Sequence, residues 1–101
     1  MPKSRILIVD DEPNLSGLVR LFLEKTQRFE VRVENRSALA LSAAREFRPD
    51  MILLDVNMPG KDGGDVAREI QADPVLGSVP IIFCTSLISR ANDSLLSLRR
   101  L

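Results

Sequence analysis

Short apolar runs alternate along the chain with segments of helical periodicity. Three runs are continuously apolar and lie at 6–9, 51–54 and 80–84. Runs of this length are typical of strands that are buried on both faces of a parallel sheet. Segment 29–33 instead alternates apolar with polar residues, which predicts a half-exposed strand at the edge of the sheet.

Apolar residues spaced three and four positions apart predict helices between these strands. The first helix begins near Pro13, which the first helical turn tolerates. The second is expected to have Asn35 as its N-cap and to end before Pro49, and two more are expected over 65–72 and 89–101. Leu15, Leu18, Val19 and Phe22 are expected to form one helix face, and Ala40, Ala43, Ala44 and Phe47 a second. Val66 and Ile70 are expected to face inward.

The resulting order, β-α-β-α-β-α-β-α, predicts an α/β fold with a parallel sheet and helices on both faces. The chain has 101 residues, which is the size of one domain. We therefore expect a single domain over 1–101, with no output domain.

Composition removes several classes of function. Positive and negative side chains are equal in number, 14 of each, which argues against direct nucleic-acid binding. The apolar runs are too short to cross a membrane, so we expect no membrane partner and a cytoplasmic location. The chain has no histidine, which excludes Ser-His-Asp and Cys-His catalysis. A single cysteine, Cys84, excludes an intrachain disulfide and is expected to be a small core residue.

Polar residues follow three of the predicted strands. These residues are Asp10 and Asp11, then Asp55, then Thr85. The carboxyl ends of parallel strands share one edge of the sheet, where ligands bind. Three carboxylates at one place repel one another unless a cation lies between them. Oxygen ligands without histidine favour Mg²⁺ or Mn²⁺, and an aspartate at such a site can form an aspartyl phosphate.

These features resemble the receiver domain of response regulators in two-component signalling. The resemblance rests on Asp10 and Asp11, on Thr85, and on segment 55–63, in which Asp55, Met-Pro and Gly keep the spacing of the family. It extends from about Arg5 to the end of the chain. It implies a flavodoxin-like doubly wound parallel sheet with strand order 2-1-3-4, in which the fifth βα unit of the family is missing.

The resemblance also implies roles for individual residues. Asp55 would be the phosphoacceptor, taking a phosphoryl group from a sensor histidine kinase or a phosphotransfer protein. Asp10, Asp11, Asp55 and the backbone carbonyl of Asn57 would hold Mg²⁺. Thr85 would move toward the phosphoryl group and signal its presence. Such a domain is a phosphorylated regulatory protein that takes part in its own phosphorylation, and it is not an enzyme acting on a metabolite.

The chain departs from the family pattern at its C-terminal end. Receivers have a fifth strand, followed by a lysine that pairs with the phosphoacceptor; the lysines here are Lys3, Lys25 and Lys61, and none holds that position. Without a fifth strand, the apolar strand 80–84 becomes an exposed edge. Three explanations stay open: the chain is a fragment, a second copy pairs through 80–84 and 89–101 to form a homodimer, or the last helix covers the edge.

Two other functions compete with the phosphoacceptor. One is a receiver-like module that is not phosphorylated and acts by binding a partner protein. The other is a Mg²⁺-dependent phosphatase that uses Asp55 as its nucleophile. Haloacid-dehalogenase-type enzymes place a second aspartate two residues after the nucleophile, where this chain has Asn57, and this difference disfavours the phosphatase.

Overall fold

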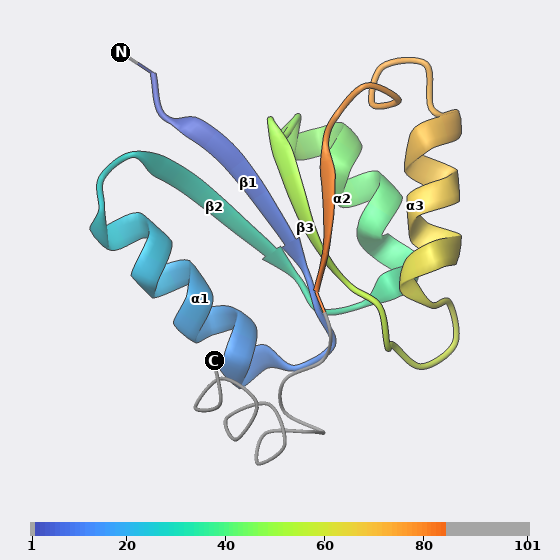
Figure 1. The fold of residues 1–101 in the computed structure, drawn as a ribbon, viewed down its shortest axis with the longest axis horizontal. Coiled ribbons are helices and arrows are strands. Elements are labelled where there is room, and N and C mark those ends of the chain that lie inside the picture. The colour runs from blue at the N-terminus through green and yellow to red at the C-terminus, as the bar shows by residue number, and fades with distance from the viewer. Residues whose placement is uncertain (1, 85–101) are drawn as a thin grey trace, which may run out of the picture.

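The computed structural model describes residues 2–84, which form a parallel sheet between two layers of helix (Figure 1). The four-stranded sheet has the order β2-β1-β3-β4, so the predicted fold class and strand order are confirmed. Thr85 and the predicted helix 89–101 lie outside the described residues. The strands are β1 (Ser4–Val9), β2 (Phe29–Glu34), β3 (Met51–Asp55) and β4 (Ile81–Cys84), and the helices are α1 (Pro13–Lys25), the 3-10 turn η1 (Ser37–Leu39), α2 (Ala40–Phe47) and α3 (Gly63–Ala72).

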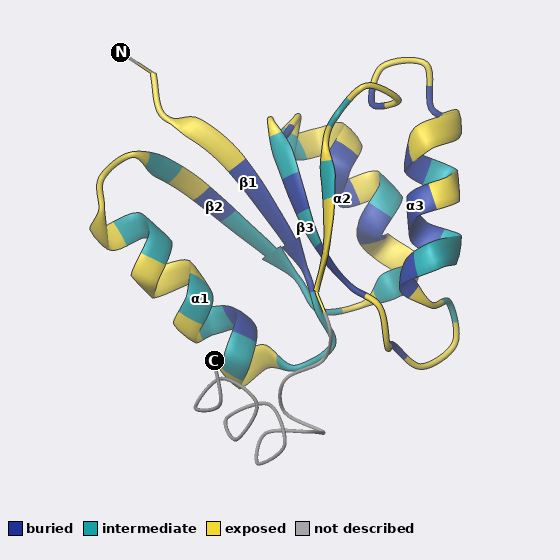
Figure 2. Ribbon diagram, in the orientation of Figure 1, coloured by how far each residue is buried: buried dark blue, intermediate teal, exposed yellow. Residues whose placement is uncertain are grey.

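The side chains of β1 alternate between two apolar clusters, one on each face of the sheet. Leu7 and Val9 belong to the larger cluster, beneath α2 and α3, while Ile6 and Ile8 belong to the smaller one, beneath α1. Figure 2 shows the buried residues concentrated along the central strands. This two-sided burial explains the continuous apolar run, because both faces of a central strand must exclude water.

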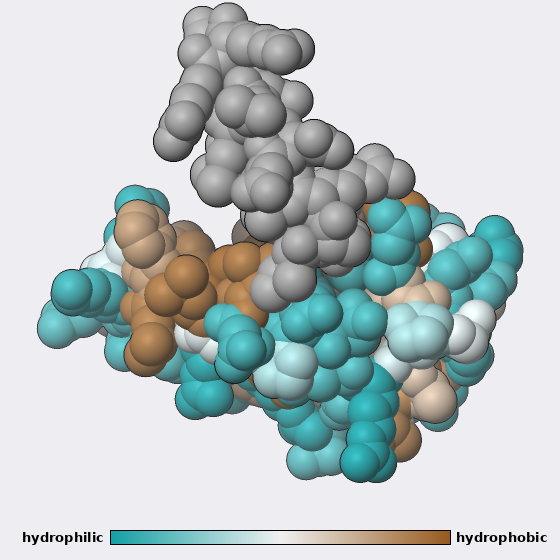
Figure 3. Space-filling model, turned by 90° about the horizontal axis from the view of Figure 1, so that it is seen from below, coloured by the Kyte–Doolittle hydropathy of each residue, from teal (hydrophilic) through white to brown (hydrophobic). Residues whose placement is uncertain are grey.

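Helix α1 is the only described helix on its face of the sheet, and this changes which of its residues are buried. Val19 packs against the smaller cluster, but Leu18 is 65% exposed and Phe22 is 76% exposed, so the predicted apolar face of this helix is only partly buried. The most buried residue of α1 is Ser16. Figure 3 shows apolar side chains gathered on the side of the molecule where α1 lies. Helical periodicity identified the apolar stripe, whereas the neighbouring strands cover only one flank of it.

The helices on the other face agree better with the predicted pattern. Ala40, Ala43 and Ala44 are buried, and so are Val66 and Ile70. The predicted N-cap is wrong, because η1 begins after Arg36 and α2 after Leu39, while the side chain of Asn35 is used elsewhere, as described below. Within the described residues, no helix has both the length and the apolar character needed to cross a membrane.

Strand β4 pairs with β3 on one side only, since no other described strand adjoins it. Ile81 packs against the larger cluster, but Ile82 is 47% exposed and Phe83 is 51% exposed. The expected exposed apolar edge is therefore present in the described part of the chain. Cys84 is also exposed, so its prediction as a core residue is wrong, because it is the last residue of a strand at the margin of the sheet.

Candidate functional site

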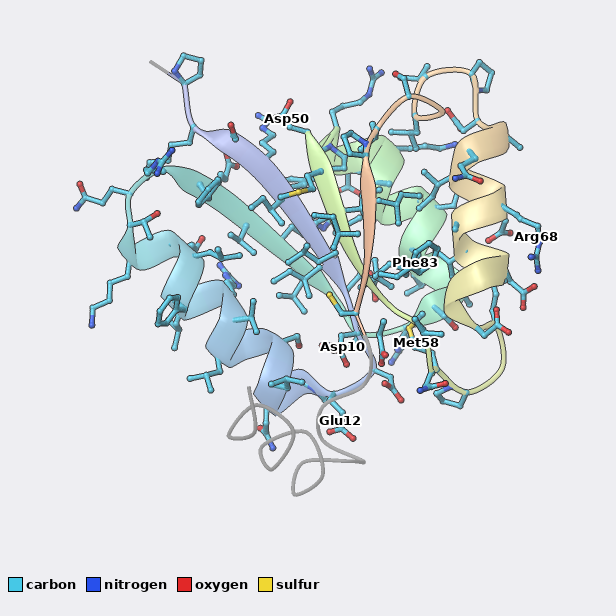
Figure 4. All side chains as sticks on the ribbon, viewed as in Figure 1. Asp10, Glu12, Asp50, Met58, Arg68 and Phe83 are labelled. Atoms are coloured by element: carbon cyan, nitrogen blue, oxygen red, sulfur yellow. The ribbon has the colours of Figure 1, made fainter. Side chains whose placement is uncertain are left out.

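The parallel register brings the acidic residues to one end of the sheet. Val9 is aligned with Leu54 in the pairing of β1 with β3, so Asp10 and Asp11 continue from β1 beside Asp55, the last residue of β3. Carboxylate oxygens of the three aspartates, one from each, lie within 4.8 Å of one another. Figure 4 shows Asp10 at this end of the sheet and Asp50, which precedes β3, at the opposite end. The predicted convergence of the three acids is thus present.

Backbone amides hold two of these carboxylates in place. The N–H of Glu12 donates to Asp10 Oδ1 at 2.8 Å, and the N–H of Asn57 donates to Asp55 Oδ1 at 3.1 Å. The other oxygen of Asp55, Oδ2, is buried and has no hydrogen-bond partner among the described residues. Burying a carboxylate oxygen without a partner costs free energy, so Asp55 Oδ2 is a candidate ligand atom for a cation.

Burial governs the electrostatics of the site. Asp55 is only 2% exposed, and this burial raises its pKa from 3.8 to about 6, against the lowering effect of the Asn57 N–H; the charges of Asp10 and Asp11 raise it further. Burial also raises the pKa of Asp10. The hydrogen bond from the Glu12 N–H lowers this pKa, and the charges of Asp11 and Glu12 raise it further. The cluster therefore favours either protonation or a cation, and a hard divalent cation suits oxygen donors.

The loop between β3 and α3 packs closely around Asp55. Met58 is buried in the larger cluster, and Gly60 adopts a positive φ of 75°, a conformation that glycine reaches without steric cost. A Cβ on Gly63 would stand 2.4 Å from the carbonyl oxygen of Asp55, which is closer than Cβ atoms approach other heavy atoms in proteins. Asp62 then begins α3 through a reciprocal capping box with Asp65. The Met-Pro and Gly spacing therefore has a packing reason in this chain.

None of the described lysines is positioned to pair with Asp55. Lys61 is bound elsewhere, because its Nζ donates to both carboxylate oxygens of Glu69 at 3.0 and 2.9 Å. Lys3 precedes β1, at the end of the sheet away from the acids, and Lys25 closes the last turn of α1. Lys61 is therefore a loop residue engaged in its own ion pair with Glu69.

Two polar residues near the site were missed by reasoning from the sequence. Asn35 Nδ2 donates to the carbonyl oxygen of Asp10 at 2.7 Å and to Ser16 Oγ at 3.0 Å. The only sequence signal was a polar residue directly after a strand, which reads equally well as a helix cap. Asn57, by contrast, is exposed, and its position beside Asp55 comes from its backbone N–H.

Two hollows adjoin the acids. One, of about 80 Å³, is mostly apolar and lies between α1 and the sheet, with Asp10, Asp55 and Cys84 among its lining residues. The other, of about 250 Å³, lies between Asp11, Arg36 and the Met58-Pro59 turn. The first hollow therefore borders Asp10 and Asp55, and the second borders Asp11.

Comparison with known proteins gives one consistent result. The family model described as the response regulator receiver domain matches residues 6–95. The DNA-binding response regulator MtrA of Mycolicibacterium smegmatis is 40% identical over 84 residues, which are 83% of this chain and 35% of that protein. The chain thus spans about a third of the length of this curated relative.

Solved structures give the same result. Chemotaxis protein CheY4 of Vibrio cholerae superposes with a TM-score of 0.77 at 25% identity, covering 93% of this chain and 80% of that one. The receiver domain of sensor histidine kinase PA1611 from Pseudomonas aeruginosa PAO1 has a TM-score of 0.74 at 30% identity, covering 81% and 66%. That structure is described as having a magnesium ion coordinated in its active site cleft.

Proposed function

The chain belongs to the response regulator receiver domain family of two-component systems, and on this premise we propose that it is a phosphoacceptor switch. Asp55 accepts a phosphoryl group from a histidine kinase or a phosphotransfer protein in a reaction that requires Mg²⁺ or Mn²⁺. The phosphorylated domain then changes conformation. The observation that carries the proposal is the convergence of the three carboxylates, one of which has a buried oxygen with no hydrogen-bond partner within residues 2–84.

The residues present fit a hard divalent cation. Asp10, Asp11, Asp55 and the backbone carbonyl of Asn57 offer only oxygen donors, which Mg²⁺ prefers, and Asp55 Oδ2 is an acceptor without a donor among the described residues. When bound, the cation offsets negative charge on the transferring phosphoryl oxygens. The likeness to the magnesium-bound receiver domain of PA1611 supports the same assignment.

The protein's own part in the reaction is to present a nucleophile in fixed geometry. A carboxylate oxygen of Asp55 forms a bond to phosphorus as the bond from phosphorus to the donor histidine nitrogen breaks, and that nitrogen keeps the electron pair. The Asn57 N–H fixes the orientation of the carboxylate through Oδ1. Thr85, the residue after β4, would donate its hydroxyl hydrogen to a phosphoryl oxygen and so couple phosphorylation to the surface near β4.

The test is intact mass after incubation with acetyl phosphate, with and without Mg²⁺. We expect a single phosphoryl addition that requires the cation and disappears in Asp55→Asn. Asp50→Asn is the matched control, because Asp50 lies at the opposite end of the sheet (Figure 4), where it accepts the Arg5 N–H. Labelling of Asp55→Asn to the wild-type level would refute the assignment of the phosphoacceptor.

A second candidate is a receiver-like module that acts by binding alone. Its support is that Lys61 is engaged with Glu69 and that no described lysine reaches Asp55. Absence of any phosphoryl addition in folded protein would favour this candidate. Either function accommodates the proposed homodimer through 80–84 and 89–101, which the exposed Ile82 and Phe83 of β4 support.

A further inference from the structure

Asn35, the residue after β2, joins three chain segments beside the acid cluster. Its Nδ2 donates one hydrogen bond to the carbonyl oxygen of Asp10 at 2.7 Å and a second to Ser16 Oγ at 3.0 Å. Ser16 is 1% exposed, and its hydroxyl in turn lies 2.9 Å from the carbonyl oxygen of Glu12, to which it donates. One side chain therefore connects the end of β2 with the loop after β1 and with the first turn of α1.

The loop held in this way carries both N-terminal acids. The carbonyl that Asn35 binds belongs to the peptide bond between Asp10 and Asp11, so the hydrogen bond restrains the backbone of both residues. The backbone of β2 restrains the same loop, because the N–H of Asp10 donates to the carbonyl oxygen of Glu34 at 3.1 Å. Two consecutive residues, Glu34 at the end of β2 and Asn35 after it, thus bind the N–H and the carbonyl group of Asp10.

This restraint acts against a repulsion. The carboxylates of Asp10 and Asp11 have oxygens within 4.8 Å of an oxygen of Asp55, and like charges at this separation push the loop outward. A loop free to move would separate the carboxylates and lose the geometry that a cation needs. The donors from Asn35 are neutral, so they hold the loop without supplying the positive charge that a cation would otherwise bring.

We propose that Asn35 is a positioning residue that keeps Asp10 and Asp11 in the arrangement that binds the divalent cation. It would act through the Asp10 carbonyl and Ser16 without touching the cation. The inference rests on the proposed function, because it assigns a purpose to the metal site of that proposal. Removing partners that orient metal ligands costs about 10–100-fold in metal affinity.

The test compares Asn35→Ala with Thr26→Ala. Thr26 Oγ1 donates to the carbonyl oxygen of Leu23 at 2.7 Å, at the end of α1 away from the acids, so its loss removes a similar bond remote from the site. In Mg²⁺ titrations followed by amide chemical shifts, we expect Asn35→Ala to bind about tenfold more weakly and Thr26→Ala to match the wild type. Affinity of Asn35→Ala within about twofold of the wild type would overturn the proposal. If Asn35→Ala does not fold, Ser16→Ala replaces it, with an expected loss of about threefold.

A second readout needs no metal. In EDTA, the amide of Glu12, which donates to Asp10 Oδ1, is expected to exchange its hydrogen about fivefold faster in Asn35→Ala, because one restraining hydrogen bond of the loop is lost. Thr26→Ala should leave that rate unchanged. An unchanged rate in Asn35→Ala would overturn the restraint even if the wild type binds Mg²⁺. A wild type that binds no Mg²⁺ would overturn the metal role of Asn35 together with the proposed cation site, while the exchange rate still reports whether Asn35 holds the loop.

Discussion

Replacing Asp55 with asparagine is predicted to stabilise the metal-free protein at neutral pH and to lose this effect in acid. Asp55 is buried with two other aspartates nearby, and its pKa is raised from 3.8 to about 6. A carboxyl group whose pKa is raised by folding prefers to be protonated in the native state. Its ionisation therefore lowers the free energy of unfolding as the pH rises from about 4 to about 6.

The magnitude follows from the size of that shift. The difference between 3.8 and about 6 corresponds to about 3 kcal/mol, at about 1.4 kcal/mol for each pH unit. Asparagine has nearly the same shape and carries no charge, and its side-chain oxygen can still accept the N–H of Asn57. We therefore expect Asp55→Asn to raise the free energy of unfolding by up to about 3 kcal/mol above pH 6 and by little at pH 4.

The assay is urea unfolding in EDTA, followed by far-ultraviolet circular dichroism because the chain has no tryptophan or tyrosine. The difference between variant and wild type should grow between pH 4 and pH 6 and then level off. Excess Mg²⁺ should reduce the difference in unfolding free energy at pH 7, because a cation that binds the folded wild type stabilises the wild type. A variant less stable than the wild type at pH 7 in EDTA, or a difference that does not change with pH, would refute the reasoning.

Three further predictions test the surroundings of the site. Gly63→Ala should lower the free energy of unfolding by about 2 kcal/mol or more, because the alanine Cβ would stand 2.4 Å from the Asp55 carbonyl oxygen. An unchanged midpoint of thermal unfolding would contradict this close approach. Arg45 lowers the pKa of Asp73 through a hydrogen bond at 2.8 Å, so Arg45→Ala should cost stability at pH 7, and the cost should fade as the pH falls below about 4; an equal loss in urea unfolding at pH 7 and pH 3 would exclude this linkage. Phe83→Lys should abolish concentration-dependent dimer formation in sedimentation velocity, since a charge on an exposed strand opposes edge pairing. A wild type that stays monomeric at all concentrations would refute the proposed homodimer.

The sheet and its acids could be predicted because each depends on a local pattern combined with one rule of topology. The apolar run 6–9 indicated a central strand, and the structure buries it on both faces. Once β1 and β3 are parallel, Asp10 and Asp55 must emerge at the same end of the sheet.

The errors concern features that depend on what lies opposite a residue. The periodicity of α1 marks Leu18 and Phe22 as apolar positions, but it does not indicate which flank of the helix another element covers, and both are exposed. Asn35 has the local character of a helix cap, whereas its partner is the Asp10 carbonyl, 25 residues earlier. Two further features likewise require coordinates: the Asp55 oxygen that has no partner in the described part of the chain, and the close approach of Gly63 to the Asp55 carbonyl.

The hydrogen bonds around the acids explain why ion binding, folding and phosphorylation should be coupled. Among residues 2–84, the donors that reach the carboxylates of Asp10 and Asp55 are the backbone amides of Glu12 and Asn57, which orient the carboxylates without neutralising them. The repulsion therefore persists in the metal-free fold, where it adds to the larger effect of burial in raising the pKa of Asp55. A divalent cation would relieve that repulsion and also prepare Asp55 for an anionic phosphoryl group. The ions that raise the free energy of unfolding most above that of the metal-free protein should thus be those that support phosphorylation of Asp55. The coupling is tested by ranking Mg²⁺, Mn²⁺ and Ca²⁺ once by the gain in unfolding free energy and once by the extent of phosphorylation. Different rank orders would contradict it.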